Sequence, residues 1–402
     1  MPADVCRIIL FGAAIYATLY FIGRPNYVDV SLTSQKTHVR RALSRKDTLG
    51  RESSPRRQAM IDNLYQMGNI PWPNYFDNLD GADLAPLTRE LAHALDSDRI
   101  FLLKPTGCGV GQAYVENGCG RGESYSNFEC LFQPLSSCSL EDASAPGVDV
   151  IDVPGYSKMT GDSFGDFSLG EVPAVWKKRL AELHPDAQLT DGFLRYWWRA
   201  QSAAYIARLN SHTSAAVSVL RHNESQHAAW SHGRKGGKPV PYPLPAGTVS
   251  LHVRHGDKGM DLVPFDDYVN AALRFTGQNP LAFQRRLFVS SEDPSVIEDA
   301  RLLPERELEP STGPARRWEV YTSDIPRMNA GPFKQLEFYG KQRMSYAWIL
   351  QLLMALECDA WVGTRGSNWN RLIDELRCVY VDRCVAAYIE VGHDKDWKDY
   401  GP

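Results

Sequence analysis

Apolar and polar positions alternate in short blocks through the C-terminal part of the chain, from residue 247 onward. Short apolar runs predict strands at 248–253, 286–290, 360–363 and 378–381. Apolar residues at helical spacing predict helices at 265–275, from 294, at 344–358 and at 368–376. Strands that alternate with helices are typical of a parallel, doubly wound sheet. We therefore predict an α/β fold with a Rossmann-like domain over residues 247–402.

The N-terminus carries an almost unbroken apolar run at 8–23, bounded by Arg7 and Arg24. A bilayer span needs about 20 apolar residues, and no convincing small-x-small cleavage motif follows this run. We predict an uncleaved signal anchor over residues 1–26, with a cleaved secretory signal as the alternative. The polar, basic residues 27–70 are interpreted as a stem or linker. Because basic residues are denser after the run than before it, charge counting alone favours a cytosolic body.

Cysteine usage favours a lumenal body instead, because clustered cysteines predict disulfides and an oxidising compartment. Four of the eight cysteines lie in one Gly-rich segment, at Cys108, Cys119, Cys130 and Cys138. Their spacing lacks the short knuckle of zinc sites. We predict an N-terminal α/β domain over residues 71–246, with a helix at 194–209 and a Gly/Pro/Lys-rich linker or surface loop at 232–246. A net charge of -4 gives no indication of a nucleic-acid partner.

Three polar clusters follow three of the predicted strands, at 252–261, 290–293 and 364–371. Ligands of such sheets bind at the carboxyl ends of the strands, so these clusters are the candidate site. Arg254 is suited to grip a diphosphate with two charge-assisted hydrogen bonds. Glu292 and Asp293 precede Pro294, a pattern that an ordinary helix N-cap also explains. Ser367 and Asn368 stand at a predicted helix start, where free backbone N–H groups attract anions.

The clusters resemble the motifs of the α-1,6-fucosyltransferase family, which includes animal N-glycan core enzymes and bacterial enzymes that act on chitin oligomers. HVRHGDKGMD resembles the family's first motif, VSSEDPSVIEDA its second and DAWVGTRGSNWNRLIDE its third. Upstream, YWWRAQSAAYIAR is similar to a Trp-Trp-x-x-Gln helix, and FECLFQPLSSC to a segment that ends in Cys. The five matches follow the family's order over roughly residues 100 to 380.

The resemblance implies a two-lobed glycosyltransferase of the GT-B type, with an N-terminal α/β domain packed on the Rossmann-like domain. It implies an inverting, metal-independent transfer of fucose from GDP-fucose to a GlcNAc of an N-glycan or chitin-like acceptor. No cofactor is expected, and the place of action would be the Golgi lumen, on a single-pass type II anchor. Arg254 would hold the β-phosphate, His252 would contact the nucleotide, and Lys258 would lie by the reacting centre. The other donor-binding positions implied are His255, Asp257, Glu292, Asp293, Gln351, Ser367, Asn368 and Arg371.

Three positions depart from the family's pattern. His255 replaces a second arginine of the first motif. The family's catalytic glutamate lies four residues after the lysine, where this chain has Leu262, so Asp261 is the base only if the loop is one residue shorter. Gln351 replaces an acid that helps to read guanine, although an amide still hydrogen-bonds that base. The chain also stops at Pro402, before the C-terminal SH3-like domain of the animal members.

Other function classes remain open on the sequence. Arg254-His255-Gly256 after an apolar strand also matches the histidine phosphatases, in which His255 would be a nucleophile and His393-Asp394 the later pair. The Asp-x-Asp pairs at 96–98 and 394–396 would suit a metal-dependent transferase, but both fit solvated charge better. A non-catalytic glycan-binding relative is the third alternative, because the position of the base is shifted.

Overall fold

The structure is a computed structural model that describes residues 55–66, 130–133, 172, 177–178, 181–182, 191–226, 239–255, 262–306, 317–330, 332–364, 367–381, 383–384 and 387–391. The chain divides into two compact units. One contains the described residues from 130 to 208, and the other contains 55–66 and everything described from Leu209 onward. The predicted anchor at 1–26 lies outside the described residues. Within the described part, none of the helices combines the length and the apolar character that crossing a bilayer requires.

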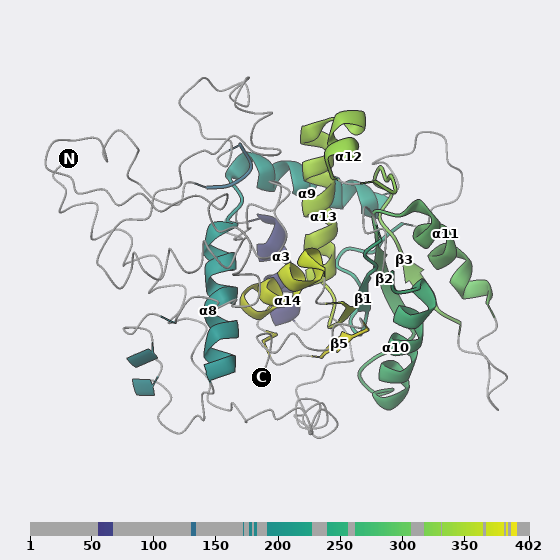
Figure 1. The fold of residues 1–402 in the computed structure, drawn as a ribbon, viewed down its shortest axis with the longest axis horizontal. Helices are drawn as coiled ribbons and strands as arrows, with labels where there is room; N and C mark the ends of the chain where they lie inside the picture. The colour runs from purple at the N-terminus through teal and green to yellow at the C-terminus, as the bar shows by residue number, and fades with distance from the viewer. Residues whose placement is uncertain are drawn as a thin grey trace, which may run out of the picture. The chain divides into compact units, whose positions relative to one another are not determined.

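The second unit is built on a sheet of five parallel strands in the order β3-β2-β1-β4-β5 (Figure 1). The strands are β1 (Val249–His252), β2 (Arg286–Ser290), β3 (Glu319–Tyr321), β4 (Ala360–Gly363) and β5 (Tyr388–Glu390). The strand order reverses direction between β1 and β4, which is the signature of a doubly wound sheet. The predicted α/β fold class with a Rossmann-like parallel sheet is confirmed.

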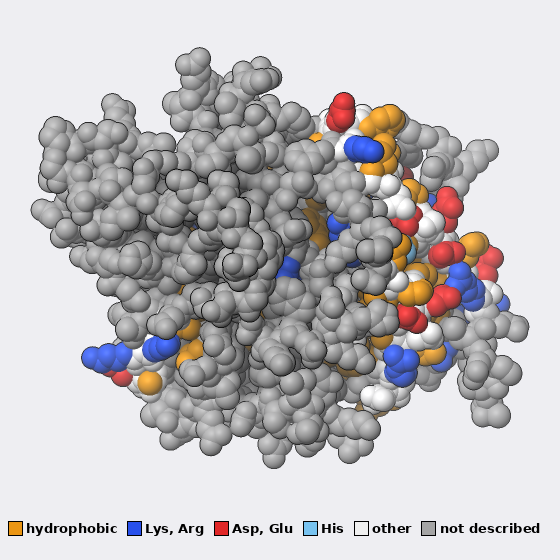
Figure 2. Space-filling model, viewed as in Figure 1, with side chains coloured by type: hydrophobic (Ala, Val, Ile, Leu, Met, Phe, Trp, Pro, Cys, Tyr) orange, Lys and Arg blue, Asp and Glu red, His pale blue; other side chains and the backbone are white. Residues whose placement is uncertain are grey.

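Helices cover both faces of this sheet. Alternate side chains of the central strands point into one apolar core with α10 (Phe265–Gln278) and α11 (Pro294–Leu302), followed by the short η7 (Leu303–Glu305). Figure 1 shows α13 (Lys341–Leu356) and α14 (Asn368–Tyr380) on the other side, with α12 (Pro332–Tyr339) next to α13. Since successive strand residues face opposite ways, one apolar run supplies both cores. Over the outer surface of α10 and α11, acidic and basic side chains lie interleaved (Figure 2).

Two further described helices belong to this unit. The described part of the predicted stem is α3 (Pro55–Gln66), which packs against α9 (Ser211–Gln226), and α9 packs against α13. The described residues between 209 and 246 also belong to the sheet unit, and the domain boundary at 246 stays a prediction. In the other unit, α8 (Asp191–Ile206) covers most of the predicted helix at 194–209 and buries Trp197 and Trp198.

The sequence placed the last strand at 378–381, and this prediction was wrong. Helix α14 continues to Tyr380, and the last strand among the described residues is β5, at Tyr388–Glu390. Cys378 is buried on this helix and Val381 is buried just after it, and Arg377 pairs with Asp374 one turn earlier at 2.5 Å. A disulfide between Cys378 and Cys384 closes the turn that follows. Strand β3, only three residues long, was missed.

Candidate functional site

The three polar clusters predicted from the sequence meet at the carboxyl edge of the sheet. β1 and β2 pair in parallel with His252 opposite Ser290. The residues that follow each strand continue this pairing, because Arg254 binds Glu292 and His255 binds Asp293. β4 lies on the other side of β1, and its following helix contributes Asn370. The site therefore lies where the strand order reverses, the usual ligand position of doubly wound sheets.

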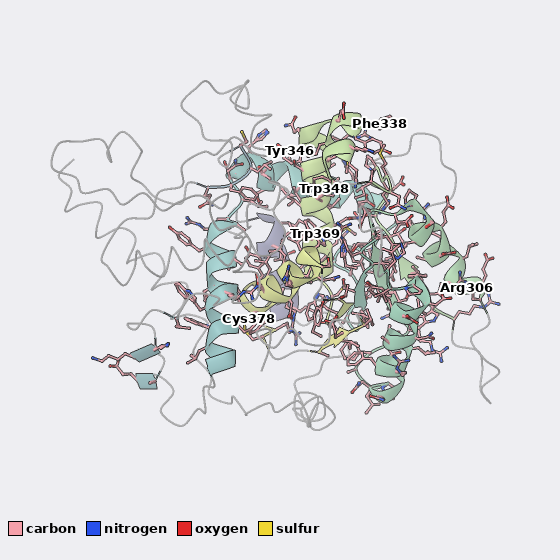
Figure 3. All side chains as sticks on the ribbon, in the orientation of Figure 1. Arg306, Phe338, Tyr346, Trp348, Trp369 and Cys378 are labelled. Carbon is pink, nitrogen blue, oxygen red and sulfur yellow. A yellow bond between two sulfur atoms is a disulfide. The ribbon has the colours of Figure 1, made fainter. Side chains whose placement is uncertain are left out.

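His252 ends β1 as a buried, neutral imidazole. Its Nδ1 lies 2.9 Å from the hydroxyl of Ser290, and its ring packs at a tilt against Trp369, 6.1 Å between centroids. Trp369 lies in the first turn of α14 (Figure 3). Burial, with the nearby charge of Arg254, lowers the pKa of His252 to about 3. A neutral ring at this position can hydrogen-bond a nucleotide without adding charge.

Arg254 forms an ion pair with Glu292 across the ends of β1 and β2. The arginine side chain keeps 23% of its surface exposed, and the glutamate 13%. The guanidinium is thus held at the rim of the sheet, where an incoming anion can reach it. A diphosphate there would compete with the Glu292 carboxylate for the Arg254 guanidinium or bind it alongside that carboxylate. Bidentate binding of phosphate suits the planar fork of arginine.

His255 is engaged at both ring nitrogens. Nδ1 lies 2.9 Å from Oδ2 of Asp293, and Nε2 lies 3.2 Å from the carbonyl oxygen of Val263. Asp293 is also the N-cap of α11, because its Oδ1 accepts from the backbone N–H and the hydroxyl of Ser295. Burial raises the pKa of Asp293, but hydrogen bonds from His255 and Ser295 outweigh it and leave the pKa lowered. The N-cap interpretation of Asp293 is confirmed.

The third cluster is a helix start tied to β1. Ser367 is the buried N-cap of α14 and accepts from the backbone N–H of Asn370. The side chain of Asn370 donates to the carbonyl oxygen of His252 at 3.1 Å. Arg371, also buried, donates its backbone N–H to the carbonyl of Ser367. The positive end of the α14 dipole therefore lies beside the end of β1, which favours an anion there.

Gln351 is buried on α13 and donates from Nε2 to the hydroxyl oxygen of Ser323 at 3.0 Å. Ser323 belongs to the segment 322–330, which leaves β3 at the same edge of the sheet. Arg327 of this segment donates to the carbonyl of Ser291, directly after β2. Sequence reasoning missed Ser323 and Arg327 because it missed β3. Prediction of that short strand would have revealed a further polar cluster at a strand end.

Four predicted site residues lie outside the part of the chain that the structure describes, or have only their backbone described. Asp257, Lys258 and Asp261 are outside the described residues, and Asn368 is described only as backbone at the start of α14. A cavity of about 350 Å³ lined by Leu281 and Arg286 among others lies near the amino-terminal ends of β1 and β2, at the opposite edge from the site. In the described residues, no His, Cys, Asp and Glu group is arranged to hold a metal ion.

No protein-family model matches the chain, and no curated protein matches it. Among solved structures it is similar to POFUT1 in complex with GDP, at 11% identity and a TM-score of 0.29, over 58% of this chain and 62% of that one. It is also similar to a mutant of Arabidopsis thaliana FUT1 in complex with GDP, at 13% identity and a TM-score of 0.39, over 90% and 81% of the two chains. POFUT1 in complex with GDP-fucose matches at 12% identity and a TM-score of 0.28, over 58% and 63%. No functional conclusion follows from likenesses at this level, and the α/β fold class rests on the sheet itself.

Proposed function

We propose that the chain is an inverting glycosyltransferase that moves fucose from GDP-fucose to a glycan acceptor. The observation that carries this proposal is the meeting of Arg254, His252 and the start of α14 at the point where the strand order reverses. A partly exposed guanidinium, a neutral imidazole and a helix N-terminus together suit a nucleoside diphosphate. The motif resemblance is the basis for proposing guanine as the nucleobase and fucose as the sugar. On the same basis we propose a two-lobed arrangement of the GT-B type.

In the proposed reaction, an acceptor hydroxyl attacks C1 of the fucose from the face opposite GDP. The bond between C1 and the β-phosphate oxygen breaks, and the electron pair leaves with GDP, whose charge Arg254 stabilises. The hydroxyl proton passes to a carboxylate, which we assign to Asp261. Lys258 adds positive charge near the leaving group. A GlcNAc of an N-glycan or chitin-like oligosaccharide, joined through an α-1,6 linkage, is the proposed acceptor, and no metal takes part.

A lumenal, membrane-anchored enzyme of the Golgi is the proposed setting. The disulfide between Cys378 and Cys384 supports an oxidising compartment, and Cys130 is disulfide-bonded as well. The apolar run at 8–23 is the proposed anchor.

The histidine phosphatase is disfavoured by the contacts of His255. A nucleophilic imidazole needs one ring nitrogen with a free lone pair. Both ring nitrogens of His255 are turned toward protein oxygen atoms, Oδ2 of Asp293 and the carbonyl oxygen of Val263, so neither is presented to a phosphate. The non-catalytic glycan-binding relative is the remaining second candidate, because it would keep the nucleotide or glycan site without a base.

The decisive experiment is a binding panel of GDP-fucose, GDP-mannose, UDP-GlcNAc and CMP-sialic acid, measured calorimetrically on the full chain. We expect GDP-fucose to bind and free GDP to displace it. Binding of a UDP- or CMP-sugar in preference would refute the guanine assignment, and hydrolysis of phosphomonoesters would favour the phosphatase.

The first prediction concerns the base. Loss of a general base commonly lowers turnover by about 10²- to 10⁴-fold. We expect Asp261→Asn to lower the rate of GDP release with acceptor by about that factor, with GDP-fucose affinity unchanged in calorimetry. Transfer at the wild-type rate would place the base elsewhere.

A further inference from the structure

The segment 322–330, which follows β3, is organised around one guanidinium. Arg327 donates from Nη2 to the carbonyl and the hydroxyl oxygen of Ser323, at 2.7 and 3.1 Å. Its Nη1 donates to the carbonyl of Ile325 at 2.9 Å, and its Nε donates to the carbonyl of Ser291 at 3.1 Å. Hydrogen bonds from a charged donor are each stronger than those between neutral groups. One side chain therefore joins the end of β2 to the segment after β3.

These contacts lead to the two ends of the proposed nucleotide site. Ser291 is followed by Glu292, which pairs with Arg254, the proposed diphosphate contact. Ser323 accepts a hydrogen bond from Gln351, the residue that the motif resemblance assigns to the recognition of guanine. Ser323 is fully buried, so its hydroxyl has little freedom to move between partners. Arg327 thus contacts Ser291 beside the diphosphate end of the site and Ser323 beside the guanine end.

We propose that Arg327 is a positioning residue that sets the spacing between Arg254, the diphosphate contact of the nucleotide site, and Gln351, its guanine contact. The proposal rests on the proposed function, since the two ends are defined by it. We assign Arg327 to positioning rather than to nucleotide contact, because its guanidinium makes four hydrogen bonds to acceptors of the protein. Lysine cannot replace it, since an ammonium is a point charge and cannot bind acceptors in several fixed directions at once.

Other parts of the unit hold this segment from outside. The hydroxyl of Tyr339 on α12 donates to the carbonyl of Arg327 at 2.8 Å. The carboxylate of Glu224 on α9 accepts from the backbone N–H of Asp324 at 3.1 and 3.2 Å. Asn329 approaches Oδ2 of Asp293 at 3.4 Å. These contacts also hold the backbone around Arg327, so a change at its guanidinium should loosen the segment and weaken the coupling of the two ends without unfolding it.

The test measures the whole nucleotide and its parts separately. GDP needs both ends at the right spacing, whereas inorganic pyrophosphate and guanosine each need one end. In Arg327→Lys we expect GDP affinity to fall about 10-fold or more, and the affinities of pyrophosphate and guanosine to change less than about 3-fold. The matched control is Arg301→Lys, because Arg301 reaches Asp324 of the same segment at 3.8 Å but is 38% exposed. The control should leave all three affinities unchanged.

A second variant changes only the guanine end of the site. Ser323→Ala deletes the oxygen shared by Arg327 and Gln351, so GDP and guanosine should weaken together while pyrophosphate does not. An equal loss of all three ligands in Arg327→Lys, or an unchanged affinity for GDP, would overturn the proposal, because the first outcome indicates general damage and the second no coupling.

Amide hydrogen exchange on the ligand-free chain separates this proposal from the proposed function. We expect Arg327→Lys to speed exchange in 322–330 and 291–293 together, and to leave β1 and β4 as in wild type. If wild type binds no GDP but both segments respond, the function is wrong and the coupling stands. If only one segment responds, or neither, Arg327 does not link them.

Discussion

Glu224 is a buried acid whose protonation is coupled to the fold. Burial raises the pKa of its carboxyl to about 7, against the lowering effects of the hydrogen bond from Asp324 and the charges of Arg327 and Arg221. In the unfolded chain the same group titrates near 4.5. Between these values the folded state holds the proton and the unfolded state has lost it, so the free energy of unfolding falls as pH rises.

We expect the protonated Glu224 to contribute at most about 3 kcal/mol to the free energy of unfolding. This contribution is present in full below pH 4.5 and is lost as pH rises to about 7. Glu224→Gln should abolish it and should be more stable than wild type at pH 8. His252, whose lowered pKa gives the opposite slope at lower pH, is common to both proteins and cancels in their difference. Urea unfolding of the two proteins between pH 4.5 and 8 measures this difference, and parallel curves would contradict the account.

At the scale of residues, the sequence predicted which polar clusters follow the strands but not the contacts among them. His252, Arg254, Glu292 and Ser367 were predicted because each follows a recognisable apolar strand or opens a helix, and such positions depend on local pattern alone. The pairing of His255 with Asp293 depends on the register of β1 against β2, which no local pattern encodes. Arg327 was missed because the short strand β3 before it was missed, and its contact with Ser291 after β2 depends on how the two strands pair.

Among the elements, β4 and α14 meet at a position that has no room for a side chain. A Cβ on Gly363 would lie 2.3 Å from Oδ1 of Asn370 and 2.7 Å from the hydroxyl oxygen of Tyr388. Asn370 is the side chain that ties α14 to the end of β1. The absence of a side chain at Gly363 therefore lets the helix start close to the strand that carries His252.

Gly363→Ala should lower the free energy of unfolding by about 1–3 kcal/mol, because the neighbours must shift to admit the methyl group. It should also weaken GDP binding, because Asn370 is displaced. The control is Gly277→Ala on α10, where an added Cβ meets nothing within 4 Å and should stabilise by about 0.4–1 kcal/mol. Denaturant unfolding of the two variants gives both values, and a Gly363→Ala protein as stable as wild type would refute the packing argument.

Strand β2, strand β4 and the start of α11 were predicted at their observed bounds because apolar runs and a Pro-initiated helix mark them directly. The last strand was misplaced because a short apolar run fits a buried helix and a buried strand equally well. Tertiary packing around Arg377 and Trp361, whose ring lies 5.0 Å below the guanidinium, decided in favour of the helix.

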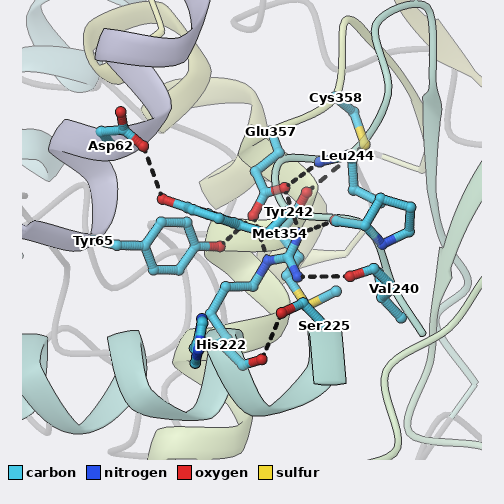
Figure 4. A network of polar contacts seen from close by, with 12 residues as sticks. Asp62, Tyr65, His222, Ser225, Val240, Tyr242, Leu244, Met354, Glu357 and Cys358 are labelled. Carbon is cyan, nitrogen blue, oxygen red and sulfur yellow. Dashed lines mark hydrogen bonds and ion pairs between the residues drawn. The ribbon is translucent and has the colours of Figure 1, made fainter. Parts of the chain in front are cut away.

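At the scale of the whole sheet unit, a buried network joins segments far apart in the chain (Figure 4). Glu357, at the end of α13, accepts two bonds from Arg221 of α9, one from the hydroxyl of Tyr65 on α3 and one from the backbone N–H of Leu244. Both carboxylate oxygens are thus satisfied, and the Glu357 charge raises the pKa of Tyr65, already raised by burial. This network explains why 55–66 and 239–247 belong with the sheet.

Glu357→Gln should lower the free energy of unfolding by about 3–5 kcal/mol, because it leaves the Arg221 charge buried without its counterion. The matched control is Glu319→Gln, whose partner Arg286 lies at 2.7 Å in a pair where the glutamate is 52% exposed. Such exposed pairs contribute about 0–1 kcal/mol. Urea titration of both variants measures the contrast, and equal losses would show that burial of the network is not what matters.

The central claim is that the end of β1 binds the diphosphate of a sugar nucleotide through Arg254. The most direct test is calorimetric titration of GDP-fucose into wild type, Arg254→Lys and the control Arg274→Lys, which changes an exposed arginine on α10. Truncating a buried, hydrogen-bonded charge contact commonly costs about 2–5 kcal/mol, and lysine cannot restore bidentate geometry. We predict saturable binding to wild type and to Arg274→Lys, with an affinity about 30-fold or more lower in Arg254→Lys. Wild-type protein that binds no sugar nucleotide, or an Arg254→Lys protein that binds as tightly as wild type, would contradict the account.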